Sequence, residues 1–222
     1  RRGCHLRLKE RKRVVTNSMN VIQADALEWC KDNTRCHRGI ITSLPELSEV
    51  KLTEDEYLKF LRQSAKSVLE CITDKGYAIF IQTDRKKRGW IDKSYYITDE
   101  AYKAGFRMMW HKIALIKRVD VTDQYKPTYS HCLCFSKKGT SAPSTPDVIH
   151  RGQILYKNGL GLDAVSMCLS FLKSHHITTV IDPFVGKGSV LRVAKQMGFT
   201  GIGIDIDPEQ CERTRFLLAL TD

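Results

Sequence analysis

Residues 180–211 read VIDPFVGKGSVLRVAKQMGFTGIGIDIDPEQC. This pattern predicts a strand, a glycine-containing turn, a helix and a second strand that ends in an acidic residue. Gly186 and Gly188 let the backbone turn sharply into the helix and approach a ligand closely. The helix is expected to begin near Ser189, where its free N–H groups favour an anionic group. Asp205 ends the second strand, where its carboxylate can accept hydrogen bonds from ribose hydroxyls.

The ligand that fits this turn contains a nucleoside but no pyrophosphate. The phosphate-binding lysine loop is absent, because residues 186–189 (GKGS) lack its first glycine at the required distance, and the three-glycine dinucleotide fingerprint is absent too. Asp182 stands at the mouth of the turn, where it would repel a pyrophosphate but attract an amino group. We therefore expect S-adenosylmethionine, which has an adenosine and an amino acid end. An ordinary βα turn would explain one glycine. It would not explain two glycines together with the acids Asp182 and Asp205 at the ends of the two strands.

Short apolar runs alternate with helical periodicity along the rest of the chain, which predicts an α/β sheet with helices on its faces. Thr53 and Glu56 form a capping box at the start of one helix. About seven strands are expected, and the stretch 137–146 is the only one that resembles a linker. The expected strands are 20–24, 38–42, 77–82, 106–117, 130–135, 179–181 and 201–206. The other expected helices are a short one that follows Asp25 and ends at Trp29, 98–104, 161–174, the one after Gly188 and a last one after residue 206.

The segment 182–189 (DPFVGKGS) resembles the DPF-x-G-x-G-[ST] cofactor motif of the amino-methyltransferases that modify exocyclic amines in DNA. Residues 203–209 (GIDIDPE) similarly resemble the G-I-E-I-N-P-E segment of these enzymes. The motif order matches their permuted beta class, the DNA N4-cytosine/N6-adenine methyltransferase-like type, in which the catalytic motif comes before the cofactor motif. The segments 21–29, 76–83 and 105–118 resemble further motifs, so the resemblance covers most of residues 18–218.

The resemblance implies a Rossmann-like class I methyltransferase fold, with a mostly parallel seven-stranded sheet and helices on both faces. It places this domain at 18–222, after a basic N-terminal extension at 1–17. Asp182 is expected to hold the amino group of S-adenosylmethionine, Asp205 its ribose hydroxyls, and Asp25 to lie beside its adenine. The expected cofactor contacts are Asp25, Asp182, Pro183, Phe184, Gly186, Gly188, Ser189, Asp205 and Ile206.

The catalytic tetrapeptide of the family is [DNS]-P-P-[YFW], and residues 43–46 read SLPE instead. We expect Ser43 to bond the acceptor, Pro45 to keep the stiff turn, and Glu46 to orient or deprotonate the acceptor, although Glu46 cannot stack on an extruded base. The acceptor is then a base amine, with stacking supplied by another aromatic such as Trp90, Tyr95 or Tyr125, or it is a different nucleophile. A third interpretation is a silent site in a domain that only binds cofactor or a partner. Glu46 as a surface acid and Ser43 as a cap of its own turn are the purely structural alternatives.

The charge of +11 comes from 36 basic and 25 acidic residues, and most of it lies in two clusters. Residues 1–13 contain seven basic side chains and one acid, and residues 84–88 contain four and one. The second cluster follows a strand at the sheet edge where ligands of open α/β sheets bind, so Arg85, Lys86, Lys87 and Arg88 are expected to contact substrate phosphates. A solvated loop is the alternative. The first cluster is an electrostatic arm for RNA, a nuclear import signal or a linker.

The segment 137–159 is too short for a dedicated duplex-reading module, so RNA is favoured over DNA as the partner. An additional domain or partner subunit would then recognise the target. The expected function is S-adenosylmethionine-dependent methylation of RNA. The alternatives are a catalytically silent RNA-binding or interaction module, and a DNA or protein methyltransferase.

The composition excludes several other classes of protein. With 42% hydrophobic residues the chain is not disordered, and no run of about 18 apolar residues predicts a membrane span. The eight cysteines are scattered, and no signal peptide is visible, so an intracellular protein is expected, in the nucleus or cytoplasm with an organelle not excluded. Cys30, Cys36 and His37 form the only cluster that resembles a metal site, and without a second ligand pair no metal is expected.

Overall fold

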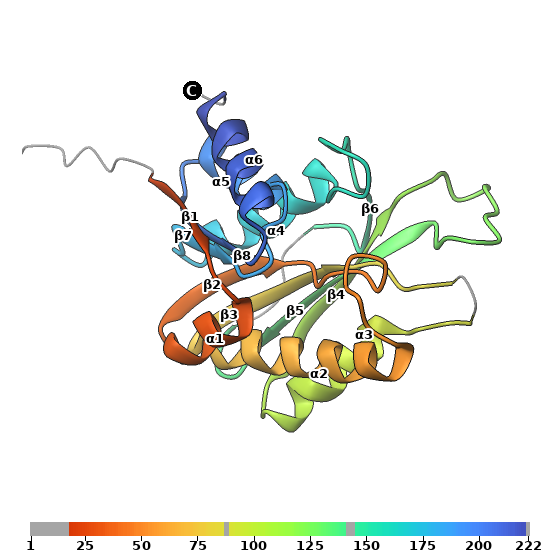
Figure 1. Ribbon diagram of the computed structural model, residues 1–222, viewed down its shortest axis with the longest axis horizontal. Coiled ribbons are helices and arrows are strands. Elements are labelled where there is room, and N and C mark those ends of the chain that lie inside the picture. The colour runs from red at the N-terminus through yellow and green to blue at the C-terminus, as the bar shows by residue number, and fades with distance from the viewer. Residues whose placement is uncertain (1–17, 87–88, 141–144, 221–222) are drawn as a thin grey trace, which may run out of the picture.

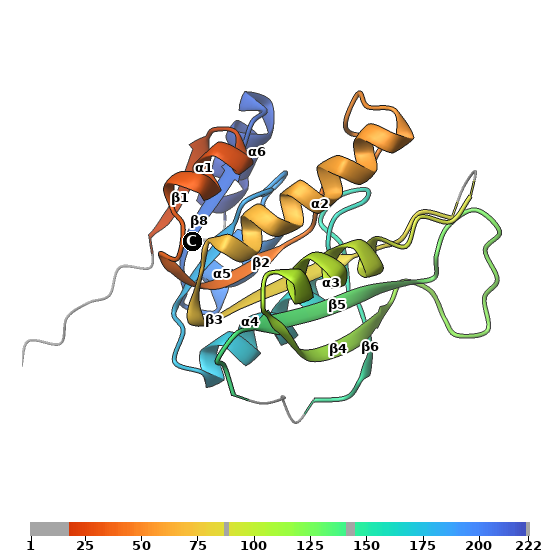
Figure 2. The ribbon, with the colours of Figure 1, turned by 90° about the horizontal axis from the view of Figure 1, so that it is seen from below.

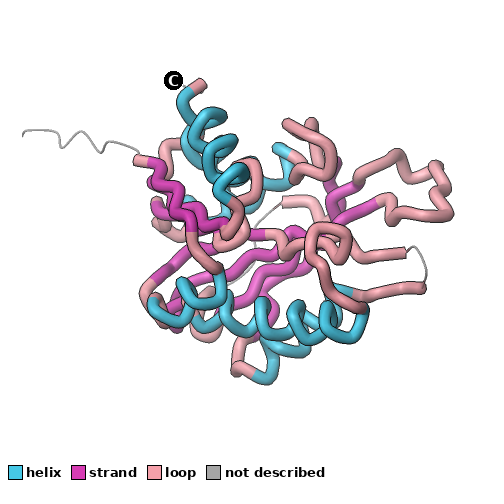
Figure 3. The backbone as a smooth tube through the Cα atoms, viewed as in Figure 1, coloured by secondary structure: helices cyan, strands magenta, loops and turns pink. Residues whose placement is uncertain are grey.

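The computed structural model describes residues 18–86, 89–140 and 145–220, which form an eight-stranded sheet between two layers of helices (Figures 1 and 3). The strands are β1 (Met19–Gln23), β2 (His37–Thr42), β3 (Ile72–Gln82), β4 (Arg107–Leu115), β5 (Tyr129–Ser136), β6 (Val148–His150), β7 (Thr179–Asp182) and β8 (Thr200–Asp205). The helices are α1 (Ala26–Asp32), α2 (Glu54–Glu70), α3 (Lys93–Lys103), α4 (Leu162–Ser174), α5 (Ser189–Gln196) and α6 (Pro208–Ala219).

The strand order is β1-β8-β7-β2-β3-β5-β4-β6. The strands from β1 to β3 in this order are parallel, and β5 runs antiparallel to both β3 and β4. Central parallel strands are covered on both faces, so they are apolar at consecutive positions rather than at alternate ones. Ile40 and Ile41 of β2 show this, since both side chains are fully buried on opposite faces.

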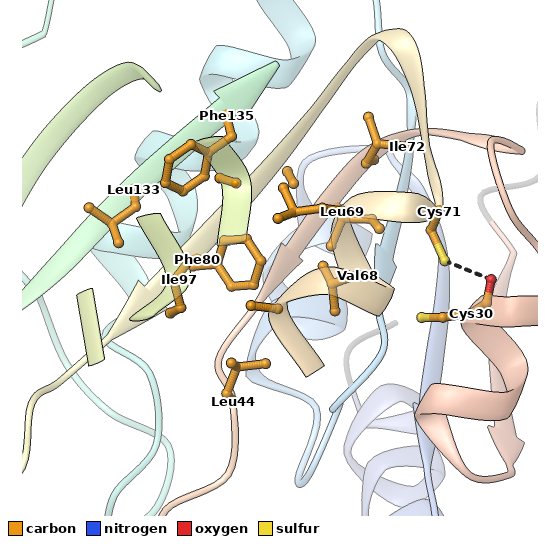
Figure 4. Close-up of a cluster of buried hydrophobic side chains, with 14 of the residues drawn as sticks. Cys30, Leu44, Val68, Leu69, Cys71, Ile72, Phe80, Ile97, Leu133 and Phe135 are labelled. Carbon is orange, nitrogen blue, oxygen red and sulfur yellow. Dashed lines mark hydrogen bonds between the residues drawn. The ribbon is translucent and has the colours of Figure 1, made fainter. Parts of the chain in front are cut away.

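The two helical layers each enclose a hydrophobic core. Helices α1, α2 and α3 cover one face, and α4, α5 and α6 cover the other (Figures 1 and 2). Figure 4 shows part of the first core, in which Phe80 and Phe135 of the sheet pack near Leu69 of α2 and Ile97 of α3. These cores fix the helices and thereby the loops at the strand ends.

The connections reverse direction between β7 and β2, which are neighbours in the sheet. From β7 the chain crosses through α5 to β8 on one side, and from β2 it crosses through α2 to β3 on the other. Such a switch point leaves a crevice at the carboxyl ends of the two strands. The order in sequence is permuted as expected, because β2 and its following loop precede β7 and its glycine turn.

The expected fold class is confirmed, and the differences are local. The strand β6 was not predicted, because three residues are too few to show a period. Helix α3 begins at Lys93 rather than at residue 98, because Asp92 accepts a hydrogen bond from the Tyr95 N–H and the distant Asp84 accepts one from the Lys93 N–H. The capping box of Thr53 and Glu56 is present as predicted.

The linker-like stretch is attached to the domain in its described parts. The Lys112 ammonium, buried in the sheet, donates hydrogen bonds to the carbonyls of Thr145 and Pro146 and pairs with Asp147. The extension at 1–17 lies outside the described residues, so its predicted role stays a prediction. No helix in the described part of the chain has the length and apolar character needed to cross a membrane.

Gly188 provides a test of the turn that joins β7 to α5. It has a φ of +83°, and an added Cβ would stand 2.6 Å from Thr214 Cγ2. We expect Gly188→Ala to lower the free energy of unfolding by more than the roughly 1–2 kcal/mol of left-handed strain alone. The matched control is Gly105→Ala, because Gly105 has a φ of +77° with nothing within 4 Å of the added atom.

A second variant separates the clash from the strain. Thr214→Ser removes Cγ2 but keeps the hydroxyl that donates to the Gly186 carbonyl at 2.7 Å. Added to Gly188→Ala, it should recover part of the lost stability in urea unfolding. Equal losses for the two alanine variants, or no recovery, would show that the contact with Thr214 is unimportant.

Candidate active site

A crevice of about 1740 Å³ opens at the carboxyl ends of the parallel strands. Its walls include the segments that follow β1, β2, β3, β7 and β8, together with parts of the loops 116–127 and 151–161. Small-molecule sites usually hold about 300–1,000 Å³, so this crevice has room for a cofactor and part of a second substrate. Most of the expected site residues line it: Asp25, Ser43, Pro45, Glu46, Arg85, Lys86, Asp182, Pro183, Phe184, Gly186, Ser189, Asp205 and Ile206.

The glycine turn has the open backbone that its sequence predicts. Gly186 has a φ of +50°, and an added Cβ would meet nothing within 4 Å, so a ligand can approach the main chain there. Gly188 does not line the crevice and is instead the N-cap of α5, without a side-chain cap. The Ser189 hydroxyl donates to the Tyr156 hydroxyl at 3.1 Å, and Lys187 lies 4.9 Å from the centre of the Tyr156 ring. Tyr156 is thus part of the site, although no sequence motif indicated it.

Asp182 has a buried carboxyl group, and only one of its two oxygens accepts hydrogen bonds from the described residues. Its Oδ1 accepts hydrogen bonds from the Thr42 hydroxyl at 2.7 Å and from the Phe184 N–H at 3.2 Å. Its Oδ2 accepts none from the described residues. Burial raises the pKa of Asp182 to about 7, against the opposite effect of these two hydrogen bonds. A cationic amino group beside Oδ2 would stabilise the ionised carboxylate.

Asp205 closes the other side of the turn. Its Oδ2 accepts a hydrogen bond from the Gly186 N–H and its Oδ1 accepts one from the Asp207 N–H, both at 2.9 Å. Each carboxylate oxygen has a second lone pair, so Asp205 can still accept from two neighbouring hydroxyls. Burial raises its pKa, against the effect of the two backbone bonds. Ile206, next in the chain, is exposed and offers an apolar surface at the crevice.

The remaining expected cofactor contacts lie at the same end of the sheet. The Asp25 carboxylate caps α1 by accepting hydrogen bonds from the N–H groups of Leu27 and Glu28 through Oδ1. Pro183 and Phe184 follow Asp182 in the crevice wall, and the Phe184 ring packs edge-on against Phe60 of α2. The role of each residue toward the cofactor stays a prediction.

The loop of residues 43–46 is held from inside the protein. The Gln82 side chain accepts a hydrogen bond from the Leu44 N–H at 2.8 Å and donates one to the Leu44 carbonyl at 3.2 Å. The Tyr57 hydroxyl donates to the Pro45 carbonyl at 2.8 Å, and burial raises the pKa of Tyr57, which keeps this donor protonated. Two carbonyls of the loop therefore already accept a hydrogen bond from the protein interior. The polar side chains of the loop at the crevice are the Ser43 hydroxyl, which donates to Gln82 Oε1 at 3.5 Å, and the Glu46 carboxylate.

Glu46 is neither a simple surface acid nor a free base. Its Oε1 pairs with the Lys93 ammonium, whose side chain is fully buried at the start of α3. Burial lowers the pKa of Lys93, and the nearby carboxylates of Glu46 and Asp84 act against this effect. The other carboxylate oxygen of Glu46, Oε2, has no partner among the described residues and can therefore accept a hydrogen bond or a proton from a ligand. Lys93 was missed because the sequence placed α3 five residues too late.

Arg85 and Lys86, the described members of the expected basic cluster, lie at the carboxyl end of β3 as predicted, but both already have partners. Arg85 pairs with Glu54 of α2, and Lys86 donates to the Asp123 carbonyl at 2.6 Å. Arg85 is also only slightly exposed. The predicted contacts of Lys87 and Arg88 fall outside the described residues.

The cysteines and histidines do not converge on a metal site in the described ranges. Cys30 is buried beside Cys71, whose thiol donates to the Cys30 carbonyl at 3.3 Å, while Cys36 is exposed. His37 stacks on Trp29 with ring centres 5.2 Å apart. The seven described cysteines are all free.

Comparisons with known proteins agree with this geometry. No family model matches the chain. The type II methyltransferase M.BsoBI of Geobacillus stearothermophilus is 28% identical over 93 residues, which is 42% of this chain. The chain spans only 18% of the length of that relative.

Solved structures match over nearly the whole chain. TTHA0409 of Thermus thermophilus, a candidate DNA modification methylase, superposes with a TM-score of 0.71 at 16% identity over 92% of this chain and 95% of its own. It has also been solved in complex with S-adenosyl-L-methionine, as has M1.HpyAVI, which gives a TM-score of 0.65 at 18% identity over 90% of this chain and 98% of its own. The cytosine-N4-specific PvuII DNA methyltransferase gives 0.65 at 15% identity over 90% of this chain and 86% of its own. The comparisons confirm the resemblance, and the chain has the Rossmann-like fold of these methyltransferases.

Proposed function

We propose that the chain is an S-adenosylmethionine-dependent methyltransferase that acts on a nucleic acid base. The observation that carries this proposal is the position of Asp182 and Ser43 at the ends of the neighbouring strands β7 and β2, where Thr42 Oγ1 donates to Asp182 Oδ1 at 2.7 Å. A cofactor bound at Asp182 and an acceptor bound at Ser43 would therefore occupy one crevice.

The residues present fit this cofactor. Oδ2 of Asp182 has no partner among the residues that the structure describes and could bind an ammonium, the backbone at Gly186 is open, and both oxygens of Asp205 retain a lone pair for ribose hydroxyls. S-Adenosylmethionine supplies an electrophilic methyl group on a positively charged sulfur. The fixed loops of the crevice would contribute mainly by positioning the acceptor close to this methyl group.

The loop of residues 43–46 can also accept the proton that an amine loses on methylation. The Ser43 hydroxyl can accept a hydrogen bond from the amine, and Oε2 of Glu46 is the carboxylate oxygen that can receive the proton. Lys93 keeps the other oxygen of Glu46 in place. Glu46 would then orient the acceptor first and take its proton afterwards.

The substrate is proposed at the level of nucleic acid. The similar proteins named above are DNA methyltransferases or candidates for that role, so they do not support the preference for RNA drawn from the short segment 137–159. That preference stays a prediction. The engaged carbonyls of Leu44 and Pro45 favour a second candidate, a binding domain without transferase activity.

Asp182 gives the proposal a pH-dependent signature. Its folded-state pKa of about 7 lies above the ordinary value of 3.8. Between these two pH values the folded protein therefore keeps a proton on Asp182 that the unfolded chain has lost. The carboxyl therefore destabilises the ligand-free fold increasingly as pH rises from about 4 to 7, by at most about 1.4 kcal/mol per pH unit.

Asp182→Asn keeps an oxygen for Thr42 and Phe184 but cannot ionise. In urea unfolding without ligand, the stability of Asp182→Asn relative to wild type should rise between pH 4 and 7 and then level off. Other titrating groups are common to both proteins and cancel in this difference. Added S-adenosylmethionine should stabilise the wild type much more than the variant. A difference that stays constant with pH would show that the pKa of Asp182 is not raised, and equal stabilisation of both proteins by S-adenosylmethionine would remove Asp182 as the ammonium site.

Methyl transfer tests the function itself. Wild type should transfer label from methyl-labelled S-adenosylmethionine to an RNA or a DNA pool but not to a protein pool. Ser43→Ala and Glu46→Gln should lower transfer by about 10²-fold, because the acceptor would be misplaced relative to the methyl group, with cofactor binding measured by calorimetry unchanged. Cofactor binding without label in any pool would favour the binding domain, and label in protein alone would contradict the nucleic acid substrate.

A further inference from the structure

Residues 116–128 connect β4 to β5 and project beyond the sheet (Figures 1 and 2). We call this segment the arm. Its base continues the β4–β5 ladder, because the Thr128 carbonyl accepts hydrogen bonds from the N–H groups of Ile116 at 2.8 Å and Lys117 at 3.1 Å. The arm therefore starts from a fixed position at the mouth of the crevice.

Asp123 organises the outer part of the arm. Its Oδ1 accepts hydrogen bonds from the N–H groups of Tyr125 at 2.8 Å and Lys126 at 2.9 Å, and its Oδ2 pairs with the Lys117 ammonium at 2.7 Å. The Lys117 ammonium and these backbone bonds lower the pKa of Asp123, so the carboxylate is charged at neutral pH. This turn orders Tyr125 and Lys126 before any ligand arrives, which reduces the entropy lost on binding.

The arm is also attached to the loop that follows β3. The Lys86 ammonium donates to the Asp123 carbonyl at 2.6 Å, and Figures 1 and 2 show the two segments side by side. Both segments line the crevice, and the loop of residues 43–46 lines it as well. The arm is therefore a pre-formed wall on the acceptor side of the site.

Tyr125 and Lys126 are the groups that this wall presents. The Tyr125 residue is 66% exposed, lines the crevice, and has no side-chain partner among the described residues. The Lys126 ammonium has no ion-pair partner among them either. Trp90 and Tyr95 are exposed as well, but they do not line the crevice.

We propose that the arm binds single-stranded nucleic acid, with a base stacked on Tyr125 and a phosphate near Lys126. The identification of the ligand as nucleic acid rests on the proposed function, and the presentation of the two side chains rests on the arm itself. An exposed ring beside an unpaired cation is the combination that binds single strands, because every base has a face that can stack. The Tyr125 ring would also provide an aromatic surface for stacking a base, which Glu46 cannot provide.

Tyrosine variants provide the first test, with fluorescently labelled short single strands of RNA and of DNA as probes. Tyr125→Ala should weaken binding by about 5- to 100-fold, and Tyr125→Phe should bind like wild type. The matched control is Tyr95→Ala, because Tyr95 is 56% exposed on α3 outside the crevice. Equal binding by Tyr125→Ala and wild type would overturn the proposal, as would equal losses in the Tyr125 and Tyr95 variants.

Two variants of Asp123 distinguish the effect of the ordered turn in the arm from the effect of the arm's charge. Asp123→Asn removes a negative charge but keeps the oxygen that accepts from Tyr125 and Lys126, so it should bind at least as tightly as wild type. Asp123→Ala removes the same charge and the turn, so it should bind more weakly. A purely electrostatic surface would instead bind more tightly in both variants, and that result would contradict the proposal.

The two proposals can fail separately. If wild type transfers no methyl group but the Tyr125 and Asp123 variants lose binding as described, the arm binds single strands in a domain that is not a transferase. If wild type transfers methyl groups while these variants bind every single-stranded probe normally, the arm proposal fails and the function stands. Binding of acidic peptides or duplex DNA in preference to both single strands would also overturn the arm proposal.

Discussion

The hydrogen bond from Thr42 Oγ1 to Asp182 Oδ1 joins the two halves of the sheet at the point where its connections reverse. One partner ends β2, which continues into the loop of residues 43–46, and the other ends β7, which continues into the glycine turn. The bond is buried and therefore little affected by competing water. Because both loops start from this pair, the relative position of the proposed acceptor and cofactor sites depends on it.

The two sides of the crevice differ in how they are built. On the proposed cofactor side, Asp182 accepts a hydrogen bond from the Phe184 N–H, and Asp205 accepts from the N–H groups of Gly186 and Asp207. Both carboxylates keep lone pairs for a ligand. On the acceptor side, the usual stacking residue is replaced by Glu46, and the loop is supported from below by Gln82, Tyr57 and the buried Lys93. Compared with the family motifs, the glycine turn is conserved in pattern and the loop of residues 43–46 is altered.

The sequence was sufficient for the fold and for the position of the glycine turn and its acids at the crevice, because both depend on local signals. Glycines at a βα turn, acids at strand ends and apolar periods are all visible over a few residues. The acceptor side depends on contacts between distant segments: Lys93 pairs with a residue 47 positions away, and Gln82 supports a loop 38 positions away. The same applies to Tyr156, which lies outside every motif and reaches the turn through Ser189. The basic cluster was placed correctly by the strand order, but the partners of Arg85 and Lys86 follow only from the packing of α2 and the arm.

A crystal structure with S-adenosylhomocysteine, the demethylated cofactor, is the sharpest test of the proposed roles of Asp182 and Asp205. The amino group should lie within hydrogen-bond distance of Asp182 Oδ2, and the ribose hydroxyls should bind Asp205. The sulfur should then point toward Ser43 and Glu46. A ligand bound elsewhere on the molecule, or bound in the crevice with its amino acid end away from Asp182, would contradict these roles.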